Sequence, residues 1–249
     1  MSSGVILMSG GIDSAALIPF AFDEDGMEHV TFFQIPYNSR QNQPEGRAIY
    51  EMNKWTHRKY GPTVTKWRRY NISMWDDPKS FAKPAPTDIT PEDNTIFVPG
   101  RNLVFLGMAV AYADLHLCDK VYFGAGMQDA VNQLFPDCTL GFLSSVNNAA
   151  QVGYQVTVEY PWVERSWGKA DIVKYAFDAG MPFKYMYSCY EGTPWPKHCG
   201  VCAACRSRIE AFEEAGPPIV DTTQYMSTKE LRQWYSKSQE AITSRPVTS

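Results

Sequence analysis

The sequence predicts an α/β fold, built on a doubly wound parallel β-sheet with helices on both faces. Short runs rich in β-branched and aromatic residues alternate with longer runs at helical spacing. The first of these short runs leads directly into a glycine-rich turn. The 249 residues are 44% apolar and 14% aromatic, which is enough for one large domain with a small appendage. Because parallel crossovers are right-handed, strand–helix alternation favours a sheet covered on both sides.

The predicted strands are short apolar or alternating runs. The first contains Val5-Ile6-Leu7-Met8, the second reads HVTFFQIP, and the third alternates between apolar and polar residues. Their expected bounds are Gly4–Met8, His29–Pro36, Thr63–Ile72, Asp119–Gly124 and Val156–Tyr160.

The predicted helices lie between these strands, at Ser14–Phe22, Pro44–Tyr60, Asn102–Leu117 and Lys169–Ala179. Two stretches break the alternation. Met74–Ile96 contains four prolines and is expected to be a long surface loop of the kind that often serves as a lid. Beyond Gly216, Pro217-Pro218 ends the preceding helix, and Ser227–Ile242 is expected to form a short polar helix.

Composition excludes several classes of function. The net charge is −4, and no basic stripe is visible, which argues against a nucleic-acid partner. No run of about 18 apolar residues occurs, so no membrane span is expected. The amino-terminal residues lack the basic and apolar regions of a secretion signal, so we expect a cytoplasmic protein.

The turn after the first strand, SGGIDS at residues 9–14, predicts an anion site. Gly10 and Gly11 allow the backbone to approach an anion closely, and Ser9 and Ser14 add hydroxyl donors. Asp13 would repel phosphate unless Mg²⁺ bridged the two. As an alternative, Asp13 caps the following helix.

Four of the six cysteines predict a metal site: Cys189, Cys199, Cys202 and Cys205. Their spacing suits a closed, structural zinc site. An iron–sulfur cluster and unligated or redox-active thiols are the alternatives, although Arg206 stands where a ferredoxin run has proline. His198 is expected to be a bystander, and Cys118 an ordinary packing residue.

The turn resembles the SGGxDS signature of the PP-loop ATP pyrophosphatases, which cleave ATP between its α and β phosphates. Three further stretches narrow the resemblance: Phe97–Asn102 (FVPGRN), Phe135–Cys138 (FPDC), and Ser188–Gly192 leading into the remaining cysteines and Arg206-x-Arg208. Together they are similar to the 7-cyano-7-deazaguanine synthases of queuosine biosynthesis, over residues 5–215. The resemblance implies a PP-loop fold of the adenine nucleotide alpha-hydrolase (HUP-like) type. We expect a PP-loop domain at 1–185, a four-cysteine zinc-binding segment at 186–216 and a tail at 217–249.

The family resemblance also implies a reaction. ATP with Mg²⁺ adenylates the carboxylate of 7-carboxy-7-deazaguanine, ammonia displaces AMP to give the amide, and a second ATP converts the amide into the nitrile. The implied ATP-binding residues are Met8, Ser9, Gly10, Gly11, Ile12, Asp13, Ser14, Arg101 and Asn102, with Asp13, Lys169 and Arg101 catalytic. The implied substrate-binding residues are Tyr37, Arg40, Asp129, Asp137 and Cys138. Without the motifs, Arg101 and Lys169 would be surface charges and Cys138 a small buried hydrophobe. A homodimer is also implied.

The acceptor half departs from the family pattern. The stretch GAGMQDAVNQLFPDCT is two residues longer than usual, Thr139 stands where arginine is typical, and Tyr37–Gln41 lacks the family's histidine. A second reading therefore stays open, in which a divergent antiviral-defence relative joins a deazaguanine to a protein amine. The acidic balance disfavours tRNA-modifying relatives, and FVPGRN with four cysteines disfavours NAD and GMP synthetases. A non-catalytic scaffold is disfavoured because Ser9 and Asp13 are both present.

Overall fold

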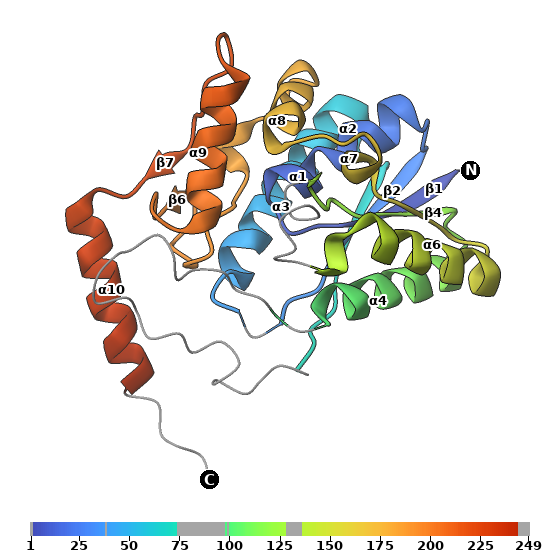
Figure 1. Ribbon diagram of the computed structural model, residues 1–249, viewed down its shortest axis with the longest axis horizontal. Helices are drawn as coiled ribbons and strands as arrows, with labels where there is room; N and C mark the ends of the chain where they lie inside the picture. The colour runs from blue at the N-terminus through green and yellow to red at the C-terminus, as the bar shows by residue number, and fades with distance from the viewer. Residues whose placement is uncertain (1, 38, 74–97, 99, 128–135, 244–249) are drawn as a thin grey trace.

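A computed structural model describes residues 2–37, 39–73, 98, 100–127 and 136–243 (Figure 1). From residue 237 onward, only the backbone of the last helix is described. The expected long loop at Met74–Ile96 lies outside these ranges.

Five strands form one parallel sheet in the order β3-β2-β1-β4-β5. They are β1 (Ser3–Leu7), β2 (His29–Gln34), β3 (Thr65–Arg69), β4 (Lys120–Tyr122) and β5 (Thr157–Glu159). Gly4 of β1 faces Val30 of β2 on one side and Lys120 of β4 on the other. The predicted parallel sheet is confirmed. Beyond β2 and β3 the two chain segments meet again at an isolated bridge between Tyr37 and Ile72.

Helices cover both faces of the sheet, as a doubly wound fold requires (Figure 1). Ile6 and Phe32 pack with α1 (Ile12–Ala15), α2 (Leu17–Pro19), α3 (Asn42–Tyr60) and α8 (Lys169–Asp178). Val5 and Phe33 face the other way, against α4 (Arg101–Leu115) and α6 (Leu140–Tyr154). Since neighbouring residues of one strand enter opposite cores, the strands read as nearly continuous apolar runs.

The first predicted helix, Ser14–Phe22, is broken rather than continuous. α1 ends at Ala15, α2 ends at Pro19, and Phe20–Glu24 forms a π-helical turn. Proline has no N–H to donate to the carbonyl four residues earlier, and its ring crowds that carbonyl. Pro19 therefore interrupts the ladder, and a local π-helical turn completes the segment.

The sequence pattern does not reveal α6. Gly141, Gly153 and several serine and asparagine residues give this stretch low helix propensity. Thr139 is the N-cap of this helix, and its Oγ1 accepts a hydrogen bond of 3.3 Å from the backbone amide of Phe142. Packing of Leu143 in the core beside α4 outweighs the weak propensity. Within the described ranges, no helix is both long and apolar enough to cross a membrane.

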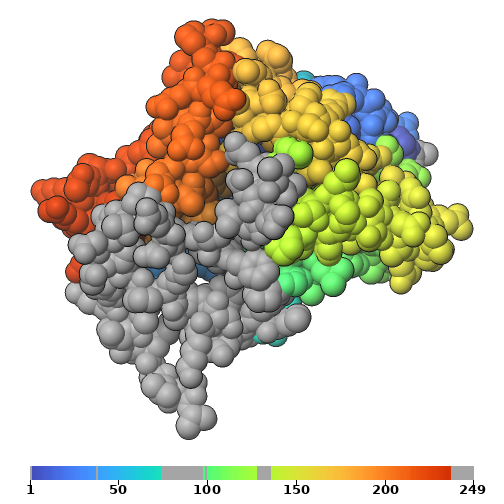
Figure 2. Space-filling view, viewed as in Figure 1, coloured from blue at the N-terminus to red at the C-terminus, as the bar shows by residue number. Residues whose placement is uncertain are grey.

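The carboxy-terminal part packs beside α8 and ends in a long α-helix. Its elements are β6 (Lys197–His198), α9 (Ala203–Ala215), β7 (Gln224–Tyr225) and α10 (Thr228–Thr243), and α7 (Pro161–Glu164) lies before α8 with Trp162 in the core. α9 ends just before Gly216, as Pro217-Pro218 predicts. Ser227 and Glu230 cap α10 reciprocally, because each side chain accepts from the other's backbone N–H. In Figure 2, α9 and α10 form one side of the molecule, and α4 and α6 the other.

Gly124, two residues after β4, allows the start of α1 to lie directly against the sheet. A β-carbon there would lie 2.9 Å from both the carbonyl carbon and oxygen of Asp13. We therefore expect Gly124→Ala to lower the free energy of unfolding by about 1–3 kcal/mol, measured by urea denaturation. In the matched control, Gly107→Ala, the new methyl group meets nothing within 4 Å on α4. That control should gain up to about 1 kcal/mol from helix propensity. An equal change in unfolding free energy for both variants would contradict the close packing of Gly124 against Asp13.

Candidate active site

A cleft opens at the carboxyl ends of β1 and β4, where the chain reverses its direction of strand addition. From β1 the chain proceeds to β2 and β3 on one side, and then crosses to β4 and β5 on the other. Loops at such a switch point diverge and leave a crevice, which is where open α/β sheets bind ligands. Part of its lining comes from the segment that follows β1 and from Phe123–Ala125 after β4.

The SGGIDS turn is held in one conformation by its own hydroxyls. Ser9 Oγ lies 3.1 Å from Ser14 Oγ, and Ser14 Oγ donates to the carbonyl of Gly11 at 3.2 Å. Gly10 has a φ of +81°, and a β-carbon there would lie 2.9 Å from the Cβ of Ala48 on α3. Glycine is therefore required both by conformation and by space. The turn presents hydroxyl and backbone donors to the cleft, as an anion site needs.

Asp13 and Lys169 meet across the cleft, although 156 positions separate them. Lys169 Nζ lies 3.0 Å from Asp13 Oδ2. Asp13 is also fixed through its backbone, because its carbonyl oxygen accepts a hydrogen bond of 2.9 Å from Trp162 Nε1. Lys169 is the first residue of α8, and the Asp171 carboxylate accepts from the Gly168 N–H to cap that helix. One anionic and one cationic group are thus fixed beside the turn.

The start of α4 forms a second wall of the cleft. Arg101 Nη1 donates a hydrogen bond of 3.0 Å to the hydroxyl of Tyr37, and Asn102 Nδ2 lies 3.4 Å from Cys138 Sγ. The backbone N–H of Asn102 donates a hydrogen bond of 3.3 Å to the Asp137 carboxylate. Burial alone would lower the pKa of Arg101, but Tyr37, Tyr190 and Asp137 together outweigh it and raise that pKa. Arg101 therefore presents a permanent positive charge.

The structure brings most of the predicted site residues into this one cleft. Those that line it are Met8, Ser9, Gly11, Asp13, Ser14, Tyr37, Arg101, Asn102, Cys138 and Lys169. Gly10, Ile12 and Asp137 lie beside lining residues. Arg40 is exposed, and its backbone lies against Gly192, outside the lining of the cleft. Asp129 lies outside the described residues.

The sequence reasoning missed Gln34 and Glu45, which also line the cleft. Gln34 ends β2, and Glu45 lies in the first turn of α3. Glu45 looked like one of the charged outer positions of a surface helix. The sequence position of Glu45 could have indicated its role. It lies shortly after the second strand, and the first turn of the following helix lies at the same edge of the sheet as the SGGIDS turn.

Burial changes the ionisation of Glu45. Burial raises the pKa of the Glu45 carboxyl to about 7, although the positive charges of Arg101 and Arg69 act in the opposite direction. A carboxyl group with such a shift inside a cleft is typical of functional sites.

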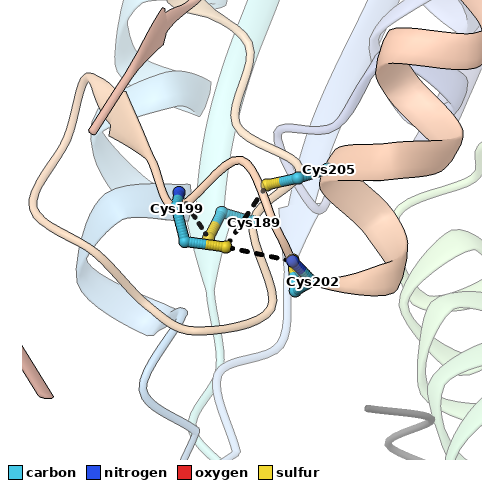
Figure 3. Close-up of side chains that lie close together, drawn as sticks. All are labelled: Cys189, Cys199, Cys202 and Cys205. Carbon is cyan, nitrogen blue, oxygen red and sulfur yellow. Dashed lines mark hydrogen bonds between the residues drawn. The ribbon is translucent and has the colours of Figure 1, made fainter. Parts of the chain in front are cut away.

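The four cysteines converge on one buried point (Figure 3). Their Sγ atoms all lie within 4.8 Å of one another, and each residue is buried. Cys189 Sγ accepts from the Cys199 amide at 3.4 Å, and Cys199 Sγ accepts from the amides of Val201 and Cys202 at 3.4 and 3.3 Å. Backbone N–H groups directed at sulfur stabilise thiolates, the form that binds metal. The donor set therefore fits one metal ion.

His198 lies next to this cluster but outside its ligand group. Its Nε2 accepts a hydrogen bond of 3.0 Å from the Ser188 amide, which places the ring proton on Nδ1, 3.3 Å from the Pro196 carbonyl oxygen. Burial, helped by the nearby charge of Arg208, lowers the pKa of His198 to about 4. A neutral ring that positions backbone agrees with the expected bystander role.

A buried arginine anchors the segment that carries the cysteines. Arg208 is fully buried on α9, and its Nη2 lies 3.2 Å from Asp221 Oδ1 and 3.1 Å from the Phe183 carbonyl oxygen. The charge of Arg208 helps to lower the pKa of Asp221, against the opposing effect of burial. Next to this anchor, the Tyr187 amide donates a hydrogen bond of 2.8 Å to the Gly10 carbonyl. The cysteine segment is thereby joined to the SGGIDS turn.

Comparison with known proteins gives one family. The family model described as queuosine biosynthesis protein QueC matches residues 3–216. A 7-cyano-7-deazaguanine synthase of Rickettsia felis is 30% identical and covers 86% of this chain and 96% of its own. The 7-cyano-7-deazaguanine synthase of Methanothermobacter thermautotrophicus is 31% identical, and the match covers 89% of this chain and 98% of that protein. Among solved structures, the U34-tRNA thiolase NcsA of Methanococcus maripaludis, with its [4Fe-4S] cluster, is 13% identical with a TM-score of 0.44. It covers 96% of this chain and 72% of its own.

Replacing one cysteine of the cluster should reduce metal content and stability together. We expect Cys202→Ser to bind well under one equivalent of metal and to lose roughly 3 kcal/mol or more of unfolding free energy. Elemental analysis and urea denaturation of the same preparation measure the two effects. Cys118→Ser, at a half-buried position outside the cluster, is the matched control and should change neither. Full metal content in Cys202→Ser would contradict ligation by all four sulfurs.

Proposed function

Because the chain belongs to the QueC family of queuosine biosynthesis proteins, we propose that it activates the carboxylate of 7-carboxy-7-deazaguanine with ATP and converts it to 7-cyano-7-deazaguanine. The chain is an enzyme of the 7-cyano-7-deazaguanine synthase type. The observation that supports this reaction best is the cleft itself, where the SGGIDS turn, the start of α4 and Cys138 face one another.

The SGGIDS turn, with its own Asp13 and the adjacent Lys169, is suited to binding the phosphates of ATP. Ser9, Gly11 and Ser14 would donate hydrogen bonds to the β and γ phosphates, and Lys169 would balance their charge. The substrate carboxylate attacks the α phosphorus, and the bond to the β-phosphate oxygen breaks, which releases pyrophosphate and leaves an acyl adenylate. Asp13 offers a carboxylate oxygen for Mg²⁺, which would neutralise phosphate charge.

The wall at the start of α4 suits the acceptor end. Tyr37, Asn102 and Cys138 line it, and Arg101 supplies positive charge near the activated carboxylate. Arg40, Asp129 and Asp137 remain predicted substrate contacts. Ammonia attacks the acyl carbon and AMP departs, giving the amide. A second ATP then adenylates the amide oxygen, and loss of AMP with two protons leaves the nitrile. Each adenylation converts a poor leaving group into AMP, a good one, at the expense of one ATP molecule. The protein itself supplies mainly position and charge.

For the cysteine cluster we propose a structural zinc ion. Four buried thiols suit the closed tetrahedral site that zinc prefers. Iron with acid-labile sulfide in the purified protein would contradict this assignment. We also propose the homodimer that the family resemblance implies, which analytical ultracentrifugation tests.

One observation keeps a protein amine as a second acceptor candidate. Thr139 replaces the arginine typical of the family, and its hydroxyl caps α6. The acceptor end therefore lacks a positive charge at this position. An enzyme with this change would retain adenylation and stop at an amide, joining the deazaguanine to a protein.

The purified protein should release AMP and pyrophosphate from ATP only when 7-carboxy-7-deazaguanine is present. Mass spectrometry of the same reaction distinguishes the nitrile, the amide and a protein adduct. The nitrile supports the proposed synthase, whereas an adduct supports the second acceptor. AMP release that is independent of any deazaguanine would show that the substrate assignment is wrong.

Loss of the Asp13 carboxylate should abolish turnover and leave the fold intact. Asp13→Ala removes one partner of a partly exposed ion pair, so unfolding free energy should change by no more than about 1 kcal/mol. Release of AMP should fall by at least about 100-fold, because charge neutralisation near the phosphates is lost. Asp23→Ala breaks the ion pair with Lys59, outside the lining of the cleft, and is the control that should keep full activity. Unfolding of Asp13→Ala would instead favour a purely structural role.

A further inference from the structure

Glu45 places an unsatisfied carboxylate in the cleft. It lies one helical turn after Gln41 on α3 and shares the lining with Tyr37 and Arg101. Within the described part of the chain, its carboxylate accepts no hydrogen bond, although Arg101 and Arg69 lie within electrostatic reach. A carboxylate has room for about four hydrogen bonds, and a ligand that enters the cleft can supply donors.

Gln34 is a second unsatisfied group in the same part of the cleft wall. Both polar atoms of its amide are buried, and neither has a hydrogen-bond partner among the described residues. The amide lies against Gly46, the neighbour of Glu45 on α3, since a β-carbon at Gly46 would lie 3.8 Å from Gln34 Oε1. Unpaired buried polar groups are rare in folded proteins, and each calls for an explanation. The unpaired Gln34 amide, together with the Glu45 carboxylate in the same cleft lining, indicates that a polar ligand completes this end of the cleft.

The shape and chemistry of this end suit a flat heterocycle. Phe105 and Tyr190 are partly buried aromatic residues that line the cleft. An ionised carboxylate only accepts hydrogen bonds. A guanine-type edge presents two adjacent donors, the ring N1–H and the exocyclic 2-amino group, which match one carboxylate. An adenine edge presents one donor beside an acceptor, so it would place a lone pair against the carboxylate.

We propose that Glu45 is the residue that selects the deazaguanine base, by accepting hydrogen bonds from its N1–H and its 2-amino group. The inference rests on the proposed function, because it assumes a 7-deazaguanine carboxylate as substrate. The carboxylate of that substrate is attached to the five-membered ring, at the opposite end from the N1–H and 2-amino edge. Contact at Glu45 therefore leaves the reacting group free to point toward the SGGIDS turn and Lys169. Donation from the N1–H and the 2-amino group favours the ionised form of Glu45, and the positive charge of Arg101 acts in the same direction.

Equilibrium binding to Glu45→Gln tests this assignment. The glutamine amide has similar volume but offers an N–H where the carboxylate accepts. Calorimetry should show affinity for 7-carboxy-7-deazaguanine about 10- to 100-fold weaker than that of the wild type. Affinity for ATP should stay within about twofold. Glu51→Gln, on the same helix beside Lys54, is the matched control and should change neither affinity.

An analogue that lacks the 2-amino group completes the test. The wild type should bind this analogue about tenfold or more weakly than the full substrate, and Glu45→Gln should discriminate little between the two. Equal binding of both compounds by the wild type, or a loss of ATP affinity in Glu45→Gln, would overturn the assignment. If the wild type consumes no ATP with 7-carboxy-7-deazaguanine and does not bind it, the proposed function fails instead. A normal unfolding curve for Glu45→Gln excludes misfolding as the cause.

Discussion

The parallel pairing of β1 with both β2 and β4 is the constraint on which the site depends. Because the chain leaves β1 toward one side of the sheet and later returns to β4 on the other, the two following loops diverge and open a crevice. Gly124 lets the start of α1 lie against the sheet at that point, and Gly10 lets the turn lie against α3. The SGGIDS turn is thus held between the sheet and α3, while Ser9, Gly11 and Ser14 line the cleft.

The cysteine segment supplies part of the wall of the cleft. Tyr187 donates its amide to the Gly10 carbonyl, and the Tyr190 carbonyl accepts from the Gln41 side chain at the base of α3. Ser188 through Tyr190 also line the cleft. A metal that fixes Cys189 therefore fixes its neighbours on either side. A metal ion bound by the four cysteines would limit how far this stretch of backbone can move at the edge of the cleft.

Features encoded in contiguous residues could be predicted from the sequence, whereas features created by packing could not. The sheet, the SGGIDS turn and the spacing of the four cysteines are local patterns, and the structure confirms the sheet and the convergence of the sulfurs. Pro19 was visible, but its replacement of a continuous helix by a π-helical turn depends on the surrounding core. α6 forms despite weak propensity because Leu143 is buried. Glu45 escaped notice because the charges around it, Arg69 of β3 and Arg101 of α4, come from elements later in the chain.

Arg208 has a consequence for where this protein can be divided. The family match ends at residue 216, yet the counter-ion of this fully buried guanidinium is Asp221. A truncated chain that stopped at the family boundary would bury a cation with no anion beside it, a defect that typically costs about 3–5 kcal/mol. The extension is therefore an integral part of the enzyme's architecture, and shortened versions for crystallisation or engineering should retain at least the stretch through Tyr225, which also donates a hydrogen bond to Asp221.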